Sequence, residues 1–157
     1  MPRQWKPDRD FSALTETQIA YAAGIIDGEG CIVISRDKNA KHVGGIGYYL
    51  ALQVLTTDGL LPNYLKGLLG GNIRKSTDPR GFADRECWYA VSAHAAAVLE
   101  LVLPYLLVKK DQALLAMEFR KTVGRPGPGA LTDEIRQQRR EQYENMRALK
   151  RKRPTHV

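Results

Sequence analysis

The segment AAGIIDGEG at residues 22–30 constrains the fold more than any other part of this sequence. Apolar residues at helical spacing precede it and the β-branched run CIVISR follows it, so it joins the end of a helix to the start of a strand. Gly24 and Gly28 lie four residues apart on one helix face, and each costs about 1 kcal/mol relative to alanine in a helix interior. Because small residues allow helices to approach closely, we expect a second helix at this face.

Two acidic residues, Asp27 and Glu29, stand at the C-terminal end of this predicted helix. The helix macrodipole disfavours negative charge there by about 0.3–1 kcal/mol, so acids at this end invite a functional explanation. A carboxylate at Glu29 would stand at the junction between the helices and a sheet. Taken alone, the segment also fits an ordinary polar turn behind a packing glycine.

The start of the helix has an equally clear signal. Thr15 can accept a hydrogen bond from the Gln18 amide while Gln18 reaches back, and Leu14 can pack against Ile19. We expect the helix to close at Gly28 or Gly30, where a glycine can adopt the left-handed conformation.

The rest of the chain predicts alternating pairs of strands and single helices. Strands are expected at 31–36, 48–55, 72–75 and 86–91, and helices at 60–69, 93–103 and 111–122. Gly70 and Gly71 end the helix at 60–69, and Pro104 ends the one at 93–103. Four strands without a βαβ pattern predict an α+β fold with a four-stranded antiparallel sheet.

Residues 124–129, GRPGPG, are typical of a linker, and a polar, basic helix is expected at 132–150. We therefore expect one domain at 1–123, followed by a linker and a basic C-terminal helix at 124–157. This tail contains eight basic and four acidic residues between 131 and 157, so four of the seven net positive charges of the chain lie there. Either a solvated helix that aids solubility or a helix that contacts flanking phosphates explains its charge.

Composition narrows the class of protein. With 43% hydrophobic and 26% charged residues, the 157-residue chain is globular rather than disordered or fibrous. Cys31 and Cys87 indicate neither a zinc site nor a disulfide framework. Without a stretch of about 20 apolar residues or a secretion signal, we expect an intracellular protein with no membrane partner. The net charge of +7 favours a polyanionic partner such as nucleic acid.

The segment at 22–30 closely resembles the LAGLIDADG motif of homing endonucleases, in the variant ending Gly-Glu-Gly. The order of elements from 15 to 122 is similar to that family's αββαββα core, and LPYLLVKKDQA at 103–113 looks like its later segment with a lysine. The resemblance covers roughly residues 11–122. It implies a site-specific double-stranded DNA endonuclease. Because the chain contains one motif, it also implies a homodimer on a long, nearly palindromic site.

The resemblance also implies roles for individual residues. Glu29 would be the catalytic metal ligand, with the Gly28 carbonyl as a further ligand. Mg²⁺ suits these oxygen donors, with Mn²⁺ as a substitute, and Ca²⁺ is expected to bind without cleavage. Lys109 would lie near the scissile phosphate, although an exposed lysine before a helix is an equally simple interpretation. Thr56 stands where some family members have a glutamine, and its hydroxyl is the candidate for orienting water.

The same resemblance places one face of the sheet in the DNA major groove. Alternation along the expected strands predicts that this face presents Ser35, Tyr49, Gln53, Arg74, Ser76 and Trp88. For Trp88, a place in the core is the simpler interpretation. Arg74 and Gln53 suit bidentate contacts with bases. The expected contacts with phosphates are Lys38 and Lys41 on the first hairpin loop and Arg80 and Arg85 on the second, and Lys110 is a further expected DNA-binding residue. The expected dimer interface consists of Ala22, Gly24, Ile25 and Gly28.

Two other classes of function fit the sequence. One is a DNA- or RNA-binding protein on the same scaffold that does not cleave, such as a maturase or a repressor, and only this alternative implies RNA. The other is a basic helix-pairing protein, which would bind DNA weakly and without sequence preference.

Overall fold

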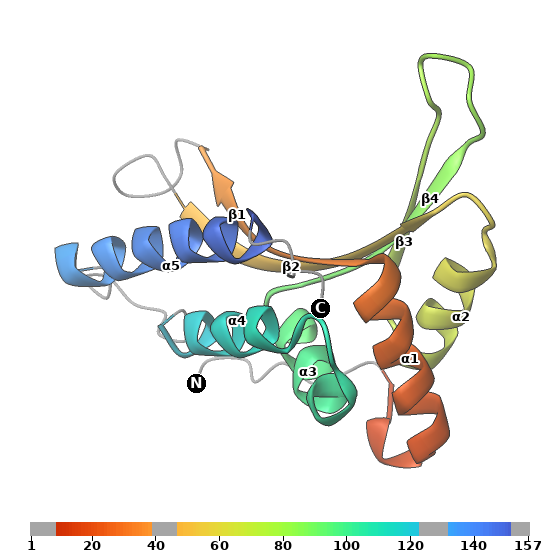
Figure 1. Ribbon diagram of the computed structural model, residues 1–157, viewed down its shortest axis with the longest axis horizontal. Coiled ribbons are helices and arrows are strands. Elements are labelled where there is room, and N and C mark those ends of the chain that lie inside the picture. Colours follow the sequence, from red (N-terminus) through yellow and green to blue (C-terminus); the bar gives the residue numbers. More distant parts are fainter. Residues whose placement is uncertain (1–8, 39–46, 123–131, 152–157) are drawn as a thin grey trace, which may run out of the picture.

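A curved sheet with helices on one face forms the body of the protein (Figure 1). The computed structural model describes residues 9–38, 47–122 and 132–151. Its strands are β1 (Gly30–Asp37), β2 (Gly47–Thr56), β3 (Asn72–Ser76) and β4 (Arg85–Val91). Its α-helices are α1 (Glu16–Glu29), α2 (Leu60–Leu69), α3 (Ser92–Val102), α4 (Lys110–Thr122) and α5 (Asp133–Arg151), with short 3₁₀ turns at Phe11–Ala13 and Leu103–Tyr105.

The strands lie in the order β1-β2-β4-β3, and every neighbouring pair is antiparallel. The sequence of elements from α1 to α3 is the αββαββα order, so the predicted α+β fold is confirmed. The predicted bounds agree with the observed ones within one or two residues. Pro104, which was expected to end the helix at 93–103, lies in a 3₁₀ turn that directly follows α3.

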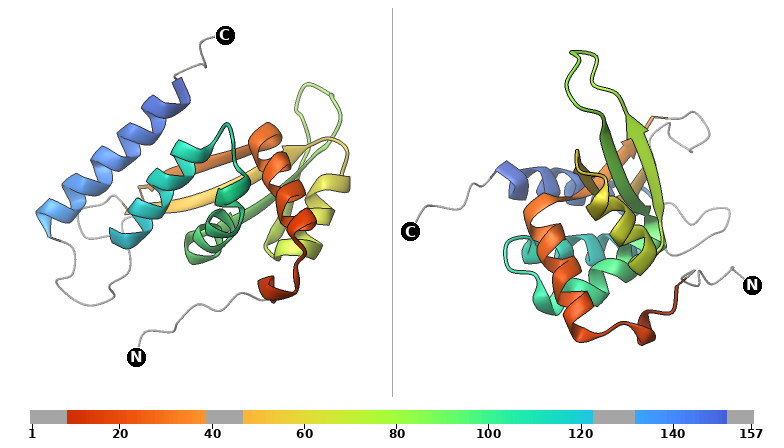
Figure 2. Two further views of the ribbon diagram at one scale, coloured as in Figure 1. Left: turned by 60° about the horizontal axis from the view of Figure 1, so that its bottom comes forward. Right: turned by 90° about the vertical axis from the view of Figure 1, so that its right-hand side faces the viewer.

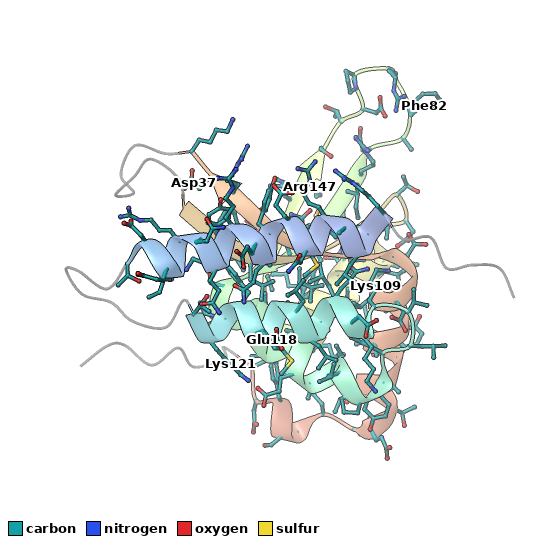
Figure 3. The ribbon with its side chains drawn as sticks, turned by 60° about the vertical axis from the view of Figure 1, so that its left-hand side comes forward. Asp37, Phe82, Lys109, Glu118, Lys121 and Arg147 are labelled. Carbon is teal, nitrogen blue, oxygen red and sulfur yellow. The ribbon has the colours of Figure 1, made fainter. Side chains whose placement is uncertain are left out.

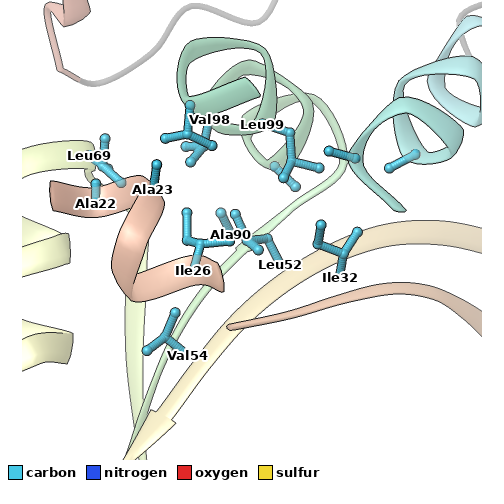
Figure 4. Close-up of a cluster of buried hydrophobic side chains, with 14 of the residues drawn as sticks. Ala22, Ala23, Ile26, Ile32, Leu52, Val54, Leu69, Ala90, Val98 and Leu99 are labelled. Carbon is cyan, nitrogen blue, oxygen red and sulfur yellow. The ribbon is translucent and has the colours of Figure 1, made fainter. Parts of the chain in front are cut away.

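Strand alternation separates two faces of the sheet. On the helix-covered face, Ile32 pairs with Leu52 and Val54 with Trp88, and all four are fully buried. Ala22, Ala23 and Ile26 of α1 and Val98 and Leu99 of α3 complete this core (Figure 4). Trp88 therefore belongs to the core, as its simpler interpretation predicted, and its indole N–H donates to the Gly70 carbonyl at 2.8 Å.

The predicted capping box at the start of α1 is confirmed. The Gln18 backbone N–H donates to Thr15 Oγ1 at 3.2 Å, and the Thr15 N–H donates to Gln18 Oε1 at 2.9 Å. At α2 the N-cap is Gly59, and Asp58 accepts from the Leu60 and Leu61 N–H groups at 2.6 and 3.0 Å. The Leu61 bond is the largest cause that holds the pKa of Asp58 below its usual value. The carboxylate of Asp58 is thus committed to starting α2.

The end of α1 differs from expectation. Gly30 caps the helix with φ −80° and ψ 157°, so it is extended and not left-handed. A glycine is required there for another reason, because a Cβ on residue 30 would lie 2.5 Å from the carbonyl oxygen of Ile26. The chain turns from α1 into β1 so tightly that only a residue without a side chain fits.

Gly30→Ala is expected to lower the free energy of unfolding by about 1–3 kcal/mol, since backbone or helix must shift to admit the methyl group. Thermal or urea unfolding measures the loss. Gly67→Ala is the matched control. Apart from the neighbouring backbone of α2 itself, no described atom lies within 4 Å of a Cβ on that residue, so alanine there is expected to stabilise by about 1 kcal/mol. Equal stability of Gly30→Ala and wild type would contradict the steric argument.

The C-terminal helix α5 packs beside α4 and along the edge strand β1 (Figure 2). Met146 joins the core, and the Tyr143 ring lies 5.6 Å from the ring of Tyr48. The predicted linker at 124–129 lies outside the described residues. Among the described residues, no helix is long and apolar enough to cross a membrane.

Candidate functional site

Glu29 lies at the last position of α1 and lines an open pocket of about 340 Å³. The end of β2, the turn before α2 and the start of β4 form the rest of this pocket, through Leu55, Thr56, Thr57, Asp58, Leu61 and Arg85. The structure therefore brings Glu29 and Thr56, two residues predicted from the sequence, into one cavity. We call it the Glu29 pocket.

One buried polar atom of a residue that lines the Glu29 pocket has no partner. Arg85 Nε forms no hydrogen bond with any described residue, whereas the buried Thr56 hydroxyl lies beside the Asp58 carboxylate and helps to lower its pKa. Buried polar groups in folded proteins nearly always bind a partner, water or a ligand. Arg85 was expected on the loop between β3 and β4, but it is the half-buried first residue of β4 and faces this pocket.

The oxygen donors at this pocket suit a hard cation. Glu29 contributes an exposed carboxylate, and Gly28 lies in the last turn of α1, where helix carbonyls lack an intrahelical partner. Mg²⁺ prefers such oxygens and usually retains several waters. No group of three or more His, Cys, Asp or Glu residues within the described part of the chain could hold a metal ion. The remaining ligands of an ion at Glu29 would thus be water, phosphate or a second chain.

Asp27 contacts a different part of the molecule from Glu29. Its carboxylate accepts the backbone N–H groups of Leu107, Val108 and Lys109 at 2.7, 3.2 and 3.0 Å. The Lys109 ammonium in turn donates to the Asp27 backbone carbonyl. Figure 3 places Lys109 where α4 begins, beside α1. Lys109 is half-buried and does not line the Glu29 pocket.

The sequence marks Asp27 as an unusual acid at a helix C-terminus but does not identify its partners. The position of Asp27 at the C-terminal end of a helix was itself an indication, because a carboxylate there is stabilised if a second helix begins beside it. Nothing in local spacing identified which helix that would be.

The open face of the sheet collects the predicted base-reading residues. Ser35 pairs with Tyr49, Gln53 with Cys31 and Tyr89, Arg74 with Cys87, and Ser76 with Arg85. All of them therefore lie on the face opposite the helices, because directly paired residues in a sheet share a face. The Arg74 guanidinium stacks over the Tyr89 ring, 5.4 Å from its centroid, which orients it on this face.

The predicted phosphate contacts have varied surroundings. Lys38 and Lys110 are exposed at the ends of β1 and α4, and Lys41 lies outside the described residues. Arg80 lies in the projecting β3–β4 hairpin, where its Nε and Nη2 donate to Asp78 at 3.1 and 3.0 Å. This guanidinium holds the pKa of the Asp78 carboxyl below its usual value. The partner carboxylate offsets part of the charge that Arg80 was expected to offer a phosphate.

The predicted interface residues of α1 divide between two sides of the helix. Gly24 and Gly28 are exposed, and apart from the neighbouring backbone of α1 itself no described atom lies within 4 Å of a Cβ placed on either. Ala22 and Ile25 face the chain's own core, with 0% and 8% exposure. This corrects the expectation for Ala22, which has no surface to offer a partner, and leaves Ile25 very little.

Exposed apolar side chains surround this glycine face. Tyr21 is 55% exposed, one turn before Gly24, and packs edge-on against Tyr64. Leu107 and Val108, which Asp27 binds through their backbones, are 85% and 63% exposed. Large apolar residues grouped on a surface are typical of protein–protein contacts.

Comparison with known proteins identifies relatives of this chain. The family model described as LAGLIDADG endonuclease matches residues 22–110. The homing endonuclease I-CvuI, in a complex with the I-CreI target in the presence of Mg, has a TM-score of 0.75 at 21% identity, over 90% of this chain and 87% of that chain. I-Vdi141I, an archaeal intron-encoded homing endonuclease complexed with DNA, has a TM-score of 0.72 at 15% identity, over the same 90% and 87%.

A longer protein also shares the fold. The I-SmaMI LAGLIDADG homing endonuclease bound to cleaved DNA has a TM-score of 0.62 at 20% identity, over 89% of this chain but 45% of that one. No curated protein sequence matches this chain. At these identities the solved structures establish the fold, and the family model supplies the relationship.

Proposed function

This chain belongs to the LAGLIDADG endonuclease family, and on that basis we propose that it is a site-specific double-stranded DNA endonuclease. It acts as a homodimer and uses a divalent metal ion, Mg²⁺ in the first instance, to hydrolyse phosphodiester bonds in a long, nearly palindromic site. One observation carries the proposal. The last acid of the motif, Glu29, is exposed in a pocket that Thr56 and Arg85 also line, and Arg85 Nε is buried without a hydrogen-bond partner among the described residues.

Each residue of the proposed site has a distinct task in hydrolysis. Glu29 and the Gly28 carbonyl would hold the metal ion, which when bound activates water and stabilises the leaving oxygen. Thr56 orients water through its hydroxyl, and Lys109 offsets negative charge that develops on the phosphate. Arg85 offers a guanidinium to a phosphate oxygen beside the pocket.

The proposed dimer rests on the number of Glu29 pockets that cleavage of both DNA strands requires. One chain has one motif and one Glu29, whereas cutting both strands of a duplex requires two sites. The exposed face with Gly24 and Gly28 on α1 is open enough for a second copy of the same helix, and Tyr21 and Leu107 extend it with apolar surface. A two-fold axis through this contact would relate two identical sheets, which matches a nearly palindromic site.

Gln53→Ala and Arg74→Ala are each expected to relax discrimination at one base pair per half-site, by about 1–3 kcal/mol. Both side chains lie on the open face of the sheet, where an amide can pair with adenine and a guanidinium with guanine. Binding selection from a randomised duplex library measures the change. Lys38→Ala is the control, because losing a phosphate contact weakens binding to every sequence and lowers the salt slope by about 1. Unchanged base preferences in both variants would contradict the assignment.

A selection from DNA libraries tests the function as a whole. The protein is incubated with randomised duplexes in Mg²⁺ and in Ca²⁺ in parallel, and the bound and cut molecules are sequenced. Specific cuts in Mg²⁺ at two-fold symmetric sites are expected. Specific binding without cutting would instead favour a cleavage-inactive maturase or repressor, and only weak, sequence-independent binding would favour a helix-pairing protein.

A further inference from the structure

We propose that Asp27, the first acid of the motif, is the residue that positions Lys109 for the reaction. This inference rests on the proposed function, because it assigns a task to one more residue of the same site. Asp27 is a positioning residue, since it touches Lys109 and the backbone before α4 rather than the reacting atoms.

Lys109 is held at both ends by Asp27. The Asp27 carboxylate accepts the backbone N–H of Lys109 at 3.0 Å, and the Asp27 backbone carbonyl accepts the ammonium group of the same lysine. The carboxylate also accepts the two preceding N–H groups, from Leu107 and Val108. We call this set of four hydrogen bonds the Asp27 clasp.

The Asp27 clasp joins the end of α1 to the turn just before α4. Lys109 precedes α4 and accepts the Ala113 N–H through its carbonyl, so its own N–H, like the carbonyls at the end of α1, lacks an intrahelical partner. A carboxylate is favourable at a helix N-terminus and an ammonium group at a helix C-terminus, so each charge lies at the pole that stabilises it. The position of Asp27, unfavourable for α1 alone, is favourable once α4 begins beside it.

In the described part of the chain, few other contacts hold residues 107–109 in place. Leu107 and Val108 expose 85% and 63% of their surface, so their side chains do not anchor the segment by burial. Among the described residues, the nearest buried side chains are Leu106, which is 4% exposed, and Ala113 within α4, whose N–H donates to the Lys109 carbonyl at 2.9 Å. Between these two anchors, the clasp holds the backbone of residues 107–109 and the ammonium group of Lys109.

The clasp also sets the spacing between two proposed catalytic groups. Asp27 lies two residues before Glu29 in the last turn of α1, so a rigid helical turn connects the residue that holds Lys109 to the residue that would hold the metal ion. An ammonium group fixed before substrate binds loses less conformational entropy in the reaction. Misplacement of a catalytic group by about 1 Å costs about 100-fold in rate.

A double-mutant cycle between Asp27→Asn and Lys109→Met tests the inference. Single-turnover cleavage in Mg²⁺ is measured on the selected target, together with binding in Ca²⁺, thermal unfolding, and amide hydrogen exchange at residues 107–109. We expect Asp27→Asn to cut about 100-fold more slowly, with unchanged DNA binding and faster exchange confined to that segment. In the Lys109→Met background, Asp27→Asn should cause no further loss, because the two residues act as one unit.

Two further variants separate positioning from folding. Asp111→Asn is the matched control, since it removes an exposed carboxylate from the first turn of α4 without touching the clasp, and it should cut at the wild-type rate. Asp27→Ser keeps one acceptor oxygen that can cap α4 but cannot hold three N–H groups. It should fold and cut slowly even if Asp27→Asn proves unstable.

The outcomes are distinguishable. Additive losses in the cycle, or wild-type cleavage by both Asp27 variants, would overturn the inference and leave the proposed function intact. A wild-type protein that binds no specific DNA and cuts none would overturn the proposed function, and this inference with it.

Discussion

Glu29→Gln is expected to abolish DNA cleavage while specific DNA binding remains. The substitution keeps the size and shape of the side chain and removes its charge. Of the two acids that line the pocket, Asp58 accepts N–H groups at the start of α2, so Glu29 is the carboxylate available to a metal ion. Mg²⁺ binds anionic oxygens far better than neutral amides. Because the ion is proposed to supply both the nucleophile and the stabilisation of the leaving oxygen, we expect a rate loss of about 10³-fold.

Parallel cleavage and binding assays on the selected target separate the two effects. Cleavage is followed in Mg²⁺ by the appearance of nicked and doubly cut duplex, and affinity is measured in Ca²⁺. Glu118→Gln is the matched control, because it removes an exposed carboxylate of α4 away from the Glu29 pocket (Figure 3). Wild-type cleavage by Glu29→Gln would show that the catalytic assignment is wrong.

Gly24→Leu is expected to convert the protein into a folded monomer that no longer cuts both strands. Gly24 is exposed, and a Cβ on it meets no described atom within 4 Å outside the backbone of α1, so the chain's own fold admits a larger side chain. Leucine also favours the helix by about 1 kcal/mol over glycine. In a two-fold contact the substitution occurs twice. At about 1–3 kcal/mol of overpacking for each, the dissociation constant of the dimer rises about 30-fold or more.

Sedimentation with and without target DNA measures this change. Gly67→Leu provides a closely matched comparison, since Gly67 is an exposed helix glycine with free space around it, but on α2. It should leave both association and cleavage unchanged. A Gly24→Leu protein that still sediments as a dimer would place the interface elsewhere on the molecule.

The α1 helix illustrates how far local patterns reach. The sequence predicts the capping box of Thr15 and Gln18 because the two residues lie three positions apart. It predicts the buried face of β2 because side chains in a strand alternate every two residues. The same alternation put Gln53 and Arg74 on one face of the sheet before their register was known. Ala22 lies two residues from Gly24, more than half a turn around α1, so helical periodicity separates it from the glycine face, and it faces the core.

The order of the elements, the α+β class and the identity of the motif were determined by the sequence itself, because they depend on contacts between near neighbours and on periodic burial. Only the tertiary structure decided why Gly30 must be glycine, that Arg85 faces the Glu29 pocket, and that Asp27 binds the backbone before α4. Asp27 and Lys109 are 82 residues apart. Hydrogen bonds across such a separation follow from how helices pack on the sheet, which no local periodicity specifies.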